Sequence, residues 1–144
     1  MLKAGLIVPH PALFQNLVST DLTTHLDAIR TFLGLCFYAK PDTATFERLL
    51  ENAAMASWDM QSKIQQLNVN AAQGLTKAHV PVLLIYGAHD ALVEPRATIT
   101  RAKELDPNIE SKLYSGSGHA PFSDEAKRFN QDIAAFATRV EQLQ

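Results

Sequence analysis

The sequence has only one cysteine, Cys36, among its 144 residues. A single cysteine cannot close a disulfide within the chain or build a thiolate metal cluster. Neither sign of charge dominates, because 13 basic and 15 acidic side chains leave a formal net charge of −2. The pI of the sequence is about 6.2. A near-neutral chain lacks the basic surface that binds phosphate backbones, so we expect no nucleic-acid partner.

Long hydrophobic runs are absent as well. The apolar stretch at residues 2–17 is interrupted by Pro9, His10 and Pro11. The next apolar run, residues 32–39, is much shorter than the roughly 20 residues that cross a bilayer. The first stretch also has no small-residue cleavage site, so it does not resemble a secretory signal. We therefore expect a cytoplasmic protein that does not enter the membrane.

Short apolar runs bounded by turn residues predict three β-strands. The first extends from Lys3 to Val8, the second covers residues 80–86, and the third covers residues 109–114. The second run is almost continuously apolar, which is typical of a strand buried on both faces of a parallel sheet.

Apolar residues at spacings of three and four predict helices in most of the remaining chain. These helices cover residues 22–36, 43–53, 58–67, 95–105 and 126–143. From residue 80 onward strands and helices alternate, which indicates an α/β unit. The helical stretch at residues 20–68 is longer than a crossover requires, so we expect an inserted helical layer within one domain spanning residues 1–144.

Titratable side chains follow the second and third predicted strands, where parallel sheets carry their functional loops. Asp90 ends the turn of residues 87–90, and His119 lies in the glycine-rich turn of residues 115–121. A carboxylate beside a histidine ring fixes its tautomer and stabilises the imidazolium that forms when the ring takes a proton. Taken singly, His119 could be a polar loop residue, and Asp90 could form an Asx-type turn or cap the helix at Pro95.

These turns carry a resemblance to the C-terminal part of the α/β-hydrolase fold. It rests on the string PVLLIYGAHD at residues 81–90, the string GSGH at residues 116–119 and the closing helix. In that family the acid follows the seventh strand and the histidine follows the eighth, so the resemblance implies Asp90 as the acid and His119 as the base. It also implies that residues 3–8 are the sixth strand and residues 20–68 a helical cap. The implied fold is a truncated α/β-hydrolase-like parallel sheet of about three strands with flanking helices.

The sequence departs from the family pattern in one major respect. The 144 residues contain no G-x-S-x-G string, and the family's first five strands and oxyanion hole have no counterpart. Without a nucleophile and an oxyanion hole, acyl transfer loses its largest electrostatic contribution, so we expect the chain alone to be inactive. We expect it to hydrolyse a small-molecule ester, or a related acyl or C–C bond, only when completed by an N-terminal partner.

The predicted first strand would leave its outer edge open, and open edges invite pairing. We therefore expect an N-terminal partner, or a second copy of the chain, to bind along residues 3–8. Two alternatives to the completed hydrolase remain open. The chain could be a non-catalytic binding or oligomerisation module derived from the family, or a small hydrolase that uses Ser117 or Ser115 as an unusual nucleophile.

Four further side chains have chemistry that a site could use. His10, after the first strand, and Trp58, on the predicted cap, could bind substrate in the cleft, although a loop surface and ordinary packing explain them equally well. His89 stands beside Asp90, but a third ligand at suitable spacing is missing, so we expect neither a metal nor a cofactor. Cys36 lies on an apolar helical face, which is typical of a core residue.

Overall fold

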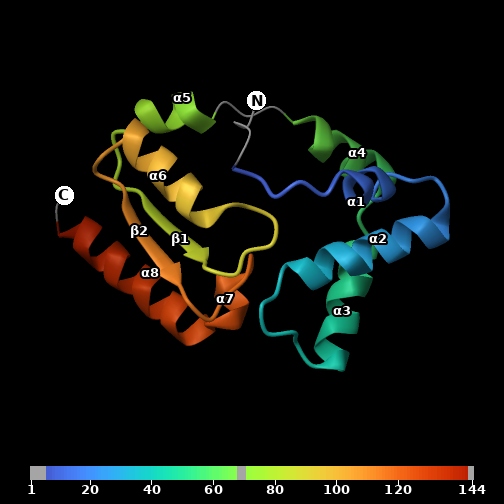
Figure 1. Ribbon diagram of the computed structural model, residues 1–144. Helices are drawn as coiled ribbons and strands as arrows, with labels where there is room; N and C mark the ends of the chain where they lie inside the picture. Colours follow the sequence, from blue (N-terminus) through green and yellow to red (C-terminus); the bar gives the residue numbers. More distant parts are fainter. Residues whose placement is uncertain (1–5, 68–70, 143–144) are drawn as a thin grey trace.

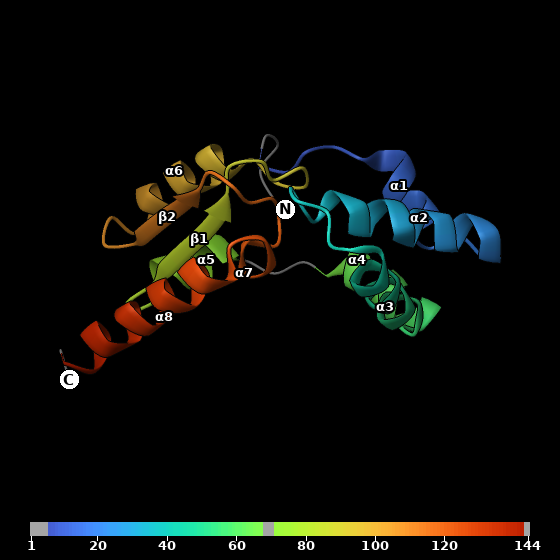
Figure 2. The same ribbon diagram turned by 90° about the horizontal axis from the view of Figure 1, so that it is seen from below.

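The computed structural model describes residues 6–67 and 71–142, which are arranged in two lobes (Figures 1 and 2). The first, the helical lobe, consists of α1 (Pro11–Asn16), α2 (Leu22–Leu35), α3 (Thr43–Ala54) and α4 (Trp58–Gln66). The second, the sheet lobe, consists of α5 (Ala71–Thr76), β1 (Leu83–Gly87), α6 (Pro95–Leu105), β2 (Glu110–Tyr114), α7 (Pro121–Asp124) and α8 (Ala126–Glu141).

The sheet lobe is built on two parallel strands. Leu83 pairs with Glu110 at one end of the ladder, and Gly87 pairs with Tyr114 at the other. Helices α6 and α8 lie on opposite sides of this pair (Figure 2). Parallel strands joined through a helix confirm the α/β class and the second and third predicted strands.

Ion pairs and a hydrogen bond hold α8 against β2. The Lys112 ammonium lies 2.5 Å from Asp132 of α8, and the guanidinium of Arg139 lies 2.6 Å from Glu110. The Tyr114 ring is completely buried, and its hydroxyl donates to Asp132 over 2.5 Å. Burial, with the neighbouring Asp132 carboxylate, raises the pKa of Tyr114 to about 12, so this hydroxyl stays protonated.

The predicted first strand is not a member of the sheet among the described residues. Residues 3–5 of that prediction lie outside the part that the structure describes. Within residues 6–8, Ile7 forms an isolated antiparallel bridge with Val93, in the loop between β1 and α6. The described sheet therefore has two strands instead of about three, because residues 6–8 pair with that loop and not with β1.

Strand β1 is less buried than its sequence predicts. Leu83, Leu84, Ile85 and Tyr86 are all only half-buried, and only Gly87 is fully enclosed. In the described part of the chain β1 pairs with β2 alone, so its other edge carries no strand. The continuous apolar run is typical of a central strand, whereas within residues 6–67 and 71–142 β1 lies at the edge of a two-stranded sheet.

Helices α2, α3 and α4 of the helical lobe begin at side-chain caps. Asp21 accepts the Thr24 N–H over 2.8 Å at the start of α2, and Asp42 accepts the Thr45 N–H over 3.0 Å at the start of α3. Ser57 caps α4 in the same way. The predicted helices over residues 22–36, 43–53 and 58–67 are confirmed to within about two residues.

Three short helices have no counterpart in the prediction. Helix α1 has Pro11 at its first position, α5 covers Ala71–Thr76, and α7 is a separate turn before α8. Proline is common at a first helical position, and Pro11, which the sequence pattern places at the end of a predicted strand, begins α1. No helix within residues 6–67 and 71–142 is long and apolar enough to span a bilayer.

Candidate active site

Asp90 is held in a tight turn that follows β1. One carboxylate oxygen, Oδ1, accepts the backbone N–H groups of Leu92 and Val93 over 2.8 and 3.0 Å. Gly87 is required at the start of this turn, because a Cβ there would lie 2.0 Å from the carbonyl oxygen of Gly118. Asp90 therefore does form an Asx-type turn, and its second oxygen is left to face the neighbouring loop.

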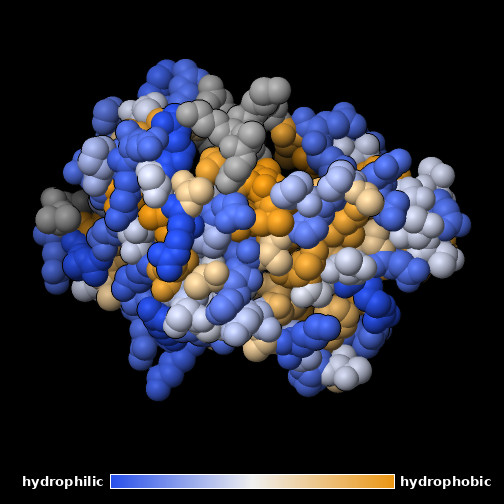
Figure 3. Space-filling view, in the orientation of Figure 1, coloured by the Kyte–Doolittle hydropathy of each residue, from blue (hydrophilic) through white to orange (hydrophobic). Residues whose placement is uncertain are grey.

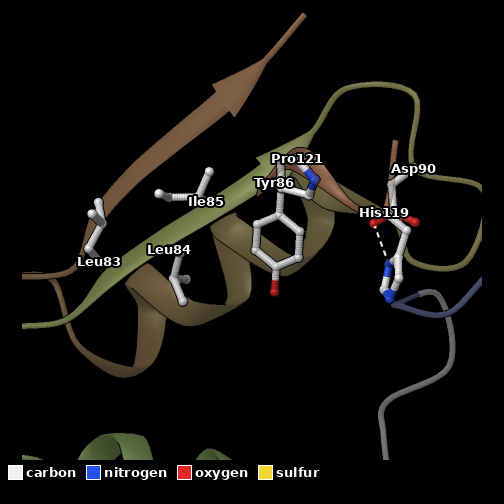
Figure 4. Close-up of a pocket in the computed structure, with 7 residues that line it drawn as sticks. All are labelled: Leu83, Leu84, Ile85, Tyr86, Asp90, His119 and Pro121. Carbon is white, nitrogen blue, oxygen red and sulfur yellow. Dashed lines mark hydrogen bonds and ion pairs between the residues drawn. The ribbon is translucent and has the colours of Figure 1, made fainter. Parts of the chain in front are cut away.

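That second oxygen accepts a hydrogen bond from His119. The Nδ1 atom of His119 lies 2.9 Å from Asp90 Oδ2, and Figure 4 shows the two side chains facing each other. The Asp90 side chain is 2% exposed, whereas the His119 side chain is 41% exposed. An ionised carboxylate only accepts hydrogen bonds, so Nδ1 is the protonated nitrogen and Nε2 is left to exchange a proton.

The pair shifts both pKa values in opposite directions. The hydrogen bond that His119 donates to Asp90 raises the pKa of His119; the carboxylate charge also raises it, and burial opposes both. Burial opposes ionisation of Asp90, but the hydrogen bonds from His119, Leu92 and Val93 outweigh it and lower the pKa of that carboxyl. Each residue therefore stabilises the charged form of the other.

The turn of residues 115–121, called here the histidine turn, is held in place by Glu125, the residue between α7 and α8. Its Oε1 atom accepts both the Gly116 N–H and the Ser117 hydroxyl over 2.9 Å, and Arg128 pairs with its other oxygen. Ser117 is completely buried. A buried hydroxyl that donates to a carboxylate is poorly placed to attack a substrate, which argues against Ser117 as a nucleophile.

An open cavity of about 350 Å³ lies beside the pair. Its lining consists of Leu83, Leu84, Ile85, Tyr86, Asp90, His119 and Pro121. In Figure 4, Leu84 and Tyr86 extend from the same side of β1, with Asp90 and His119 beyond the carboxyl end of the strand. The His119 imidazole, whose Nε2 atom can exchange a proton, therefore lies at one end of an apolar surface formed by β1.

The two residues expected to bind substrate lie elsewhere. His10 immediately precedes α1, and its Nε2 atom hydrogen-bonds the Ala91 carbonyl over 2.8 Å, which ties α1 to the Asp90 turn. Trp58, on α4, is 42% exposed and donates from its indole to the Ser19 carbonyl over 2.6 Å. Neither residue lines the cavity beside His119.

Two further histidines, His89 and His25, and the cysteine lie in contacts that stabilise the fold. The His89 ring stacks on Tyr38, with ring centroids 3.9 Å apart. His25 is buried in α2, and its Nδ1 atom hydrogen-bonds the Leu17 carbonyl. Burial raises the pKa of the Cys36 thiol to about 11, so it stays protonated and weakly nucleophilic. In the described part of the chain, no three His, Cys, Asp or Glu side chains gather closely enough to hold a metal ion.

Comparison with known proteins identifies the relatives of this arrangement. A crystal structure of a candidate aryl esterase from Burkholderia cenocepacia superposes with a TM-score of 0.94 at 51% identity, over 99% of this chain and 52% of that one. The pimeloyl-[acyl-carrier protein] methyl ester esterase of Vibrio cholerae is 33% identical over 117 residues, or 77% of this chain and 46% of that protein. The chain is homologous to the α/β-hydrolases over part of their length.

Further comparisons define the extent of this homology. The esterase RhEst1 of Rhodococcus superposes with a TM-score of 0.82 at 18% identity, which shows a shared fold only. No protein-family model matches the chain. The α/β-hydrolase resemblance in the sequence is therefore confirmed, and the chain spans about half the length of the two relatives above, 46% and 52%.

Proposed function

We propose that this chain supplies the acid and the histidine base of a Ser-His-Asp esterase. The observation that carries the proposal is the hydrogen bond from His119 Nδ1 to the buried Asp90 carboxylate, at the rim of an apolar cavity. Asp90 would hold the ring with Nε2 facing the nucleophile and would stabilise the imidazolium formed in each half-reaction. The nucleophilic serine and the oxyanion donors would come from a segment other than these 144 residues.

The proposed reaction is ester hydrolysis in two steps. His119 Nε2 takes the serine proton as the serine oxygen attacks the ester carbonyl, and then gives that proton to the departing alcohol. Water attacks the acyl-serine with His119 again as base, which releases the acid and restores the serine. Esterases among the relatives support ester substrates over the related acyl and C–C bonds considered from the sequence.

We propose that the completing segment packs along the open side of β1. Among the described residues, that edge pairs with no strand, and the apolar side chains of β1 are only half-buried. Figure 3 shows hydrophobic residues gathered in the middle of the face between the two lobes. An apolar parallel strand with one side open needs a covering partner, and the unmatched half of the Burkholderia chain is a protein segment of suitable length.

Split complementation tests this proposal. The 144-residue chain is co-expressed with the part of the Burkholderia chain that it does not match, the complex is purified, and hydrolysis of a chromogenic aryl ester is measured. We expect activity, labelling of a serine on the complementing segment by a fluorophosphonate, and loss of hydrolysis in His119→Ala. A complex that hydrolyses the ester equally well with His119→Ala would contradict the base assignment. A stable complex with no hydrolysis would instead support a non-catalytic binding module.

A further inference from the structure

Asp124, at the end of α7, joins two loops that are far apart in sequence. Its Oδ2 atom accepts the N–H of Gly118 over 2.7 Å and the N–H of Tyr38 over 3.1 Å. Gly118 belongs to the histidine turn, and Tyr38 belongs to the connection that follows α2. One carboxylate oxygen therefore connects the helical lobe to the residue next to His119.

The two loops also touch backbone to backbone. The Ala120 N–H donates to the Cys36 carbonyl over 2.9 Å. A Cβ at Gly118 would lie 2.8 Å from the Tyr38 nitrogen and 3.2 Å from the Cys36 carbonyl oxygen, so no larger side chain fits there without displacing backbone. The histidine turn thus has N–H groups on both sides of His119 fixed by groups outside the turn, at Gly118 and at Ala120.

The turn of residues 87–90, which contains Asp90, also contacts the loop after α2 and the turn that contains His119. The Tyr38 ring stacks on the His89 ring within 8° of parallel, and the His89 N–H donates to the Ser117 carbonyl over 3.0 Å. Displacement of the loop that contains Tyr38 would therefore disturb the turns on both sides of the Asp90–His119 hydrogen bond.

From these contacts we infer that Asp124 is a positioning residue, which couples the end of α2 to the orientation of His119. The carboxylate does not face the cavity beside His119 and acts through the backbone of the turn. By fixing the Gly118 peptide, Asp124 holds the backbone next to His119 in the position from which the Nδ1 atom lies 2.9 Å from Asp90 Oδ2. The effect of Asp124 on catalysis rests on the proposed function, whereas its effect on the geometry of His119 does not.

The conservative variants separate the hydrogen-bond geometry from the charge. Asp124→Asn removes the charge but keeps an oxygen that can accept both N–H groups, whereas Asp124→Glu keeps the charge and displaces the oxygen by one methylene. Asp124→Ala removes both. Asp106→Ala is the matched control, because Asp106 also accepts a nearby backbone N–H, that of Asn108, but does so before β2 and away from His119.

The first readout is an NMR titration of His119 in the 144-residue chain, which does not depend on activity. We expect Asp124→Ala and Asp124→Glu to lower the pKa of His119 toward the ordinary value of about 6.5, and Asp124→Asn and Asp106→Ala to leave it raised. If Asp124→Ala does not fold, the Asn and Glu variants still decide the question. An unchanged pKa in the Glu variant, or an equal fall in the Asn and Glu variants, would overturn the inference.

The second readout is ester hydrolysis by the complemented enzyme. We expect Asp124→Glu to lower kcat at least tenfold with little change in KM, and Asp124→Asn to restore most of kcat. If the titration responds as expected but no complemented enzyme is active, the proposed function fails while the positioning role stands. If the enzyme is active and Asp124→Glu changes neither kcat nor the titration, the positioning role fails alone.

Discussion

His119 and His25 show how differently the two lobes use the same side chain. His25 is 2% exposed, and its ring lies against Trp58 with centroids 4.6 Å apart. Its Nδ1 atom hydrogen-bonds the Leu17 carbonyl over 2.9 Å, and its Nε2 atom lies 3.4 Å from the amide nitrogen of Gln61. His119, in contrast, is partly exposed and bonded to a buried carboxylate.

The difference lies in the partners and not in the histidine itself. The contacts of His25 are a neutral carbonyl, a neutral amide and an aromatic ring, and both of its ring nitrogens have a hydrogen-bond partner. The contact of His119 is an anion that supports the imidazolium, and only one of its nitrogens is used. We interpret His25 as a structural connector of α1, α2 and α4, and His119 as a group placed to exchange protons.

The largest expected contrast is in catalysis. In the complemented enzyme, His119→Ala should lower kcat by about 10²- to 10⁴-fold, the range for loss of a general base. His25→Asn, which can keep a donor toward the Leu17 carbonyl, should leave kcat close to that of the unaltered enzyme. Steady-state ester hydrolysis measures both. Equal losses in the two variants would show that the contrast between the histidines has no catalytic meaning.

Stability should show the reverse contrast. His25→Ala should destabilise the chain by roughly 1–3 kcal/mol or more, because the Leu17 carbonyl loses its donor and a buried ring is lost. His119→Ala should cost about 1 kcal/mol or less, because water can reach the second Asp90 oxygen while the first keeps two N–H donors.

Urea-induced unfolding of the two alanine variants, monitored by circular dichroism, provides the free energies of unfolding. If His119→Ala proved the more destabilising of the two, the Asp90–His119 pair would be primarily a structural element. His119 would then have the structural role that the surroundings of His25 indicate for His25.

The close approach of Asp90 and His119 is predictable from the sequence because the signals for it are local. A carboxylate after one apolar strand and a histidine after the next lie at the same edge of a parallel sheet, and here the side chains meet at 2.9 Å. The predicted helix starts at residues 22, 43 and 58 agree with the structure, in which Asp21, Asp42 and Ser57 satisfy N–H groups only a few residues away. Both inferences depend on neighbouring residues and on strand order.

The missed features depend on contacts between distant segments. Nothing in the apolar run from Lys3 to Val8 shows that Ile7 bridges Val93, because the pairing choice is made by a loop more than eighty residues later. The bracing of the histidine turn by Glu125 and Asp124 was missed as well. The one available signal is the pair of acidic residues that follows the glycine-rich turn, because a carboxylate close to a turn can accept the backbone N–H groups of that turn.

An NMR titration sharpens the comparison through its pH dependence. Asp90→Asn should lower the pKa of His119, because the hydrogen bond and the charge that raise it are lost. In the complemented enzyme, activity should rise with pH as His119 loses its proton, at a pH above the ordinary histidine value of about 6.5. A titration of His119 that is unaffected by Asp90→Asn would disprove the electrostatic coupling.

The same pair gives the sign of the pH dependence of stability. Since the pKa of Asp90 is lowered on folding, its contribution is present above the unfolded-state pKa and is lost as the pH falls through the folded one. Since the pKa of His119 is raised, its contribution is present below the unfolded-state pKa and is lost as the pH rises through the folded one. Asp90→Asn should therefore flatten the pH profile of the unfolding free energy at both ends.

The smallest expected effect tests the surroundings of His25. Trp58→Phe keeps an aromatic ring against His25 but removes the indole N–H that donates to the Ser19 carbonyl over 2.6 Å. We expect a loss of about 0.5–1.5 kcal/mol in unfolding free energy, the usual net value of one hydrogen bond. Because Trp58 does not line the cavity beside His119, KM for a small ester should not change. A large rise in KM would instead place the indole against the substrate in the completed enzyme, as the sequence analysis expected.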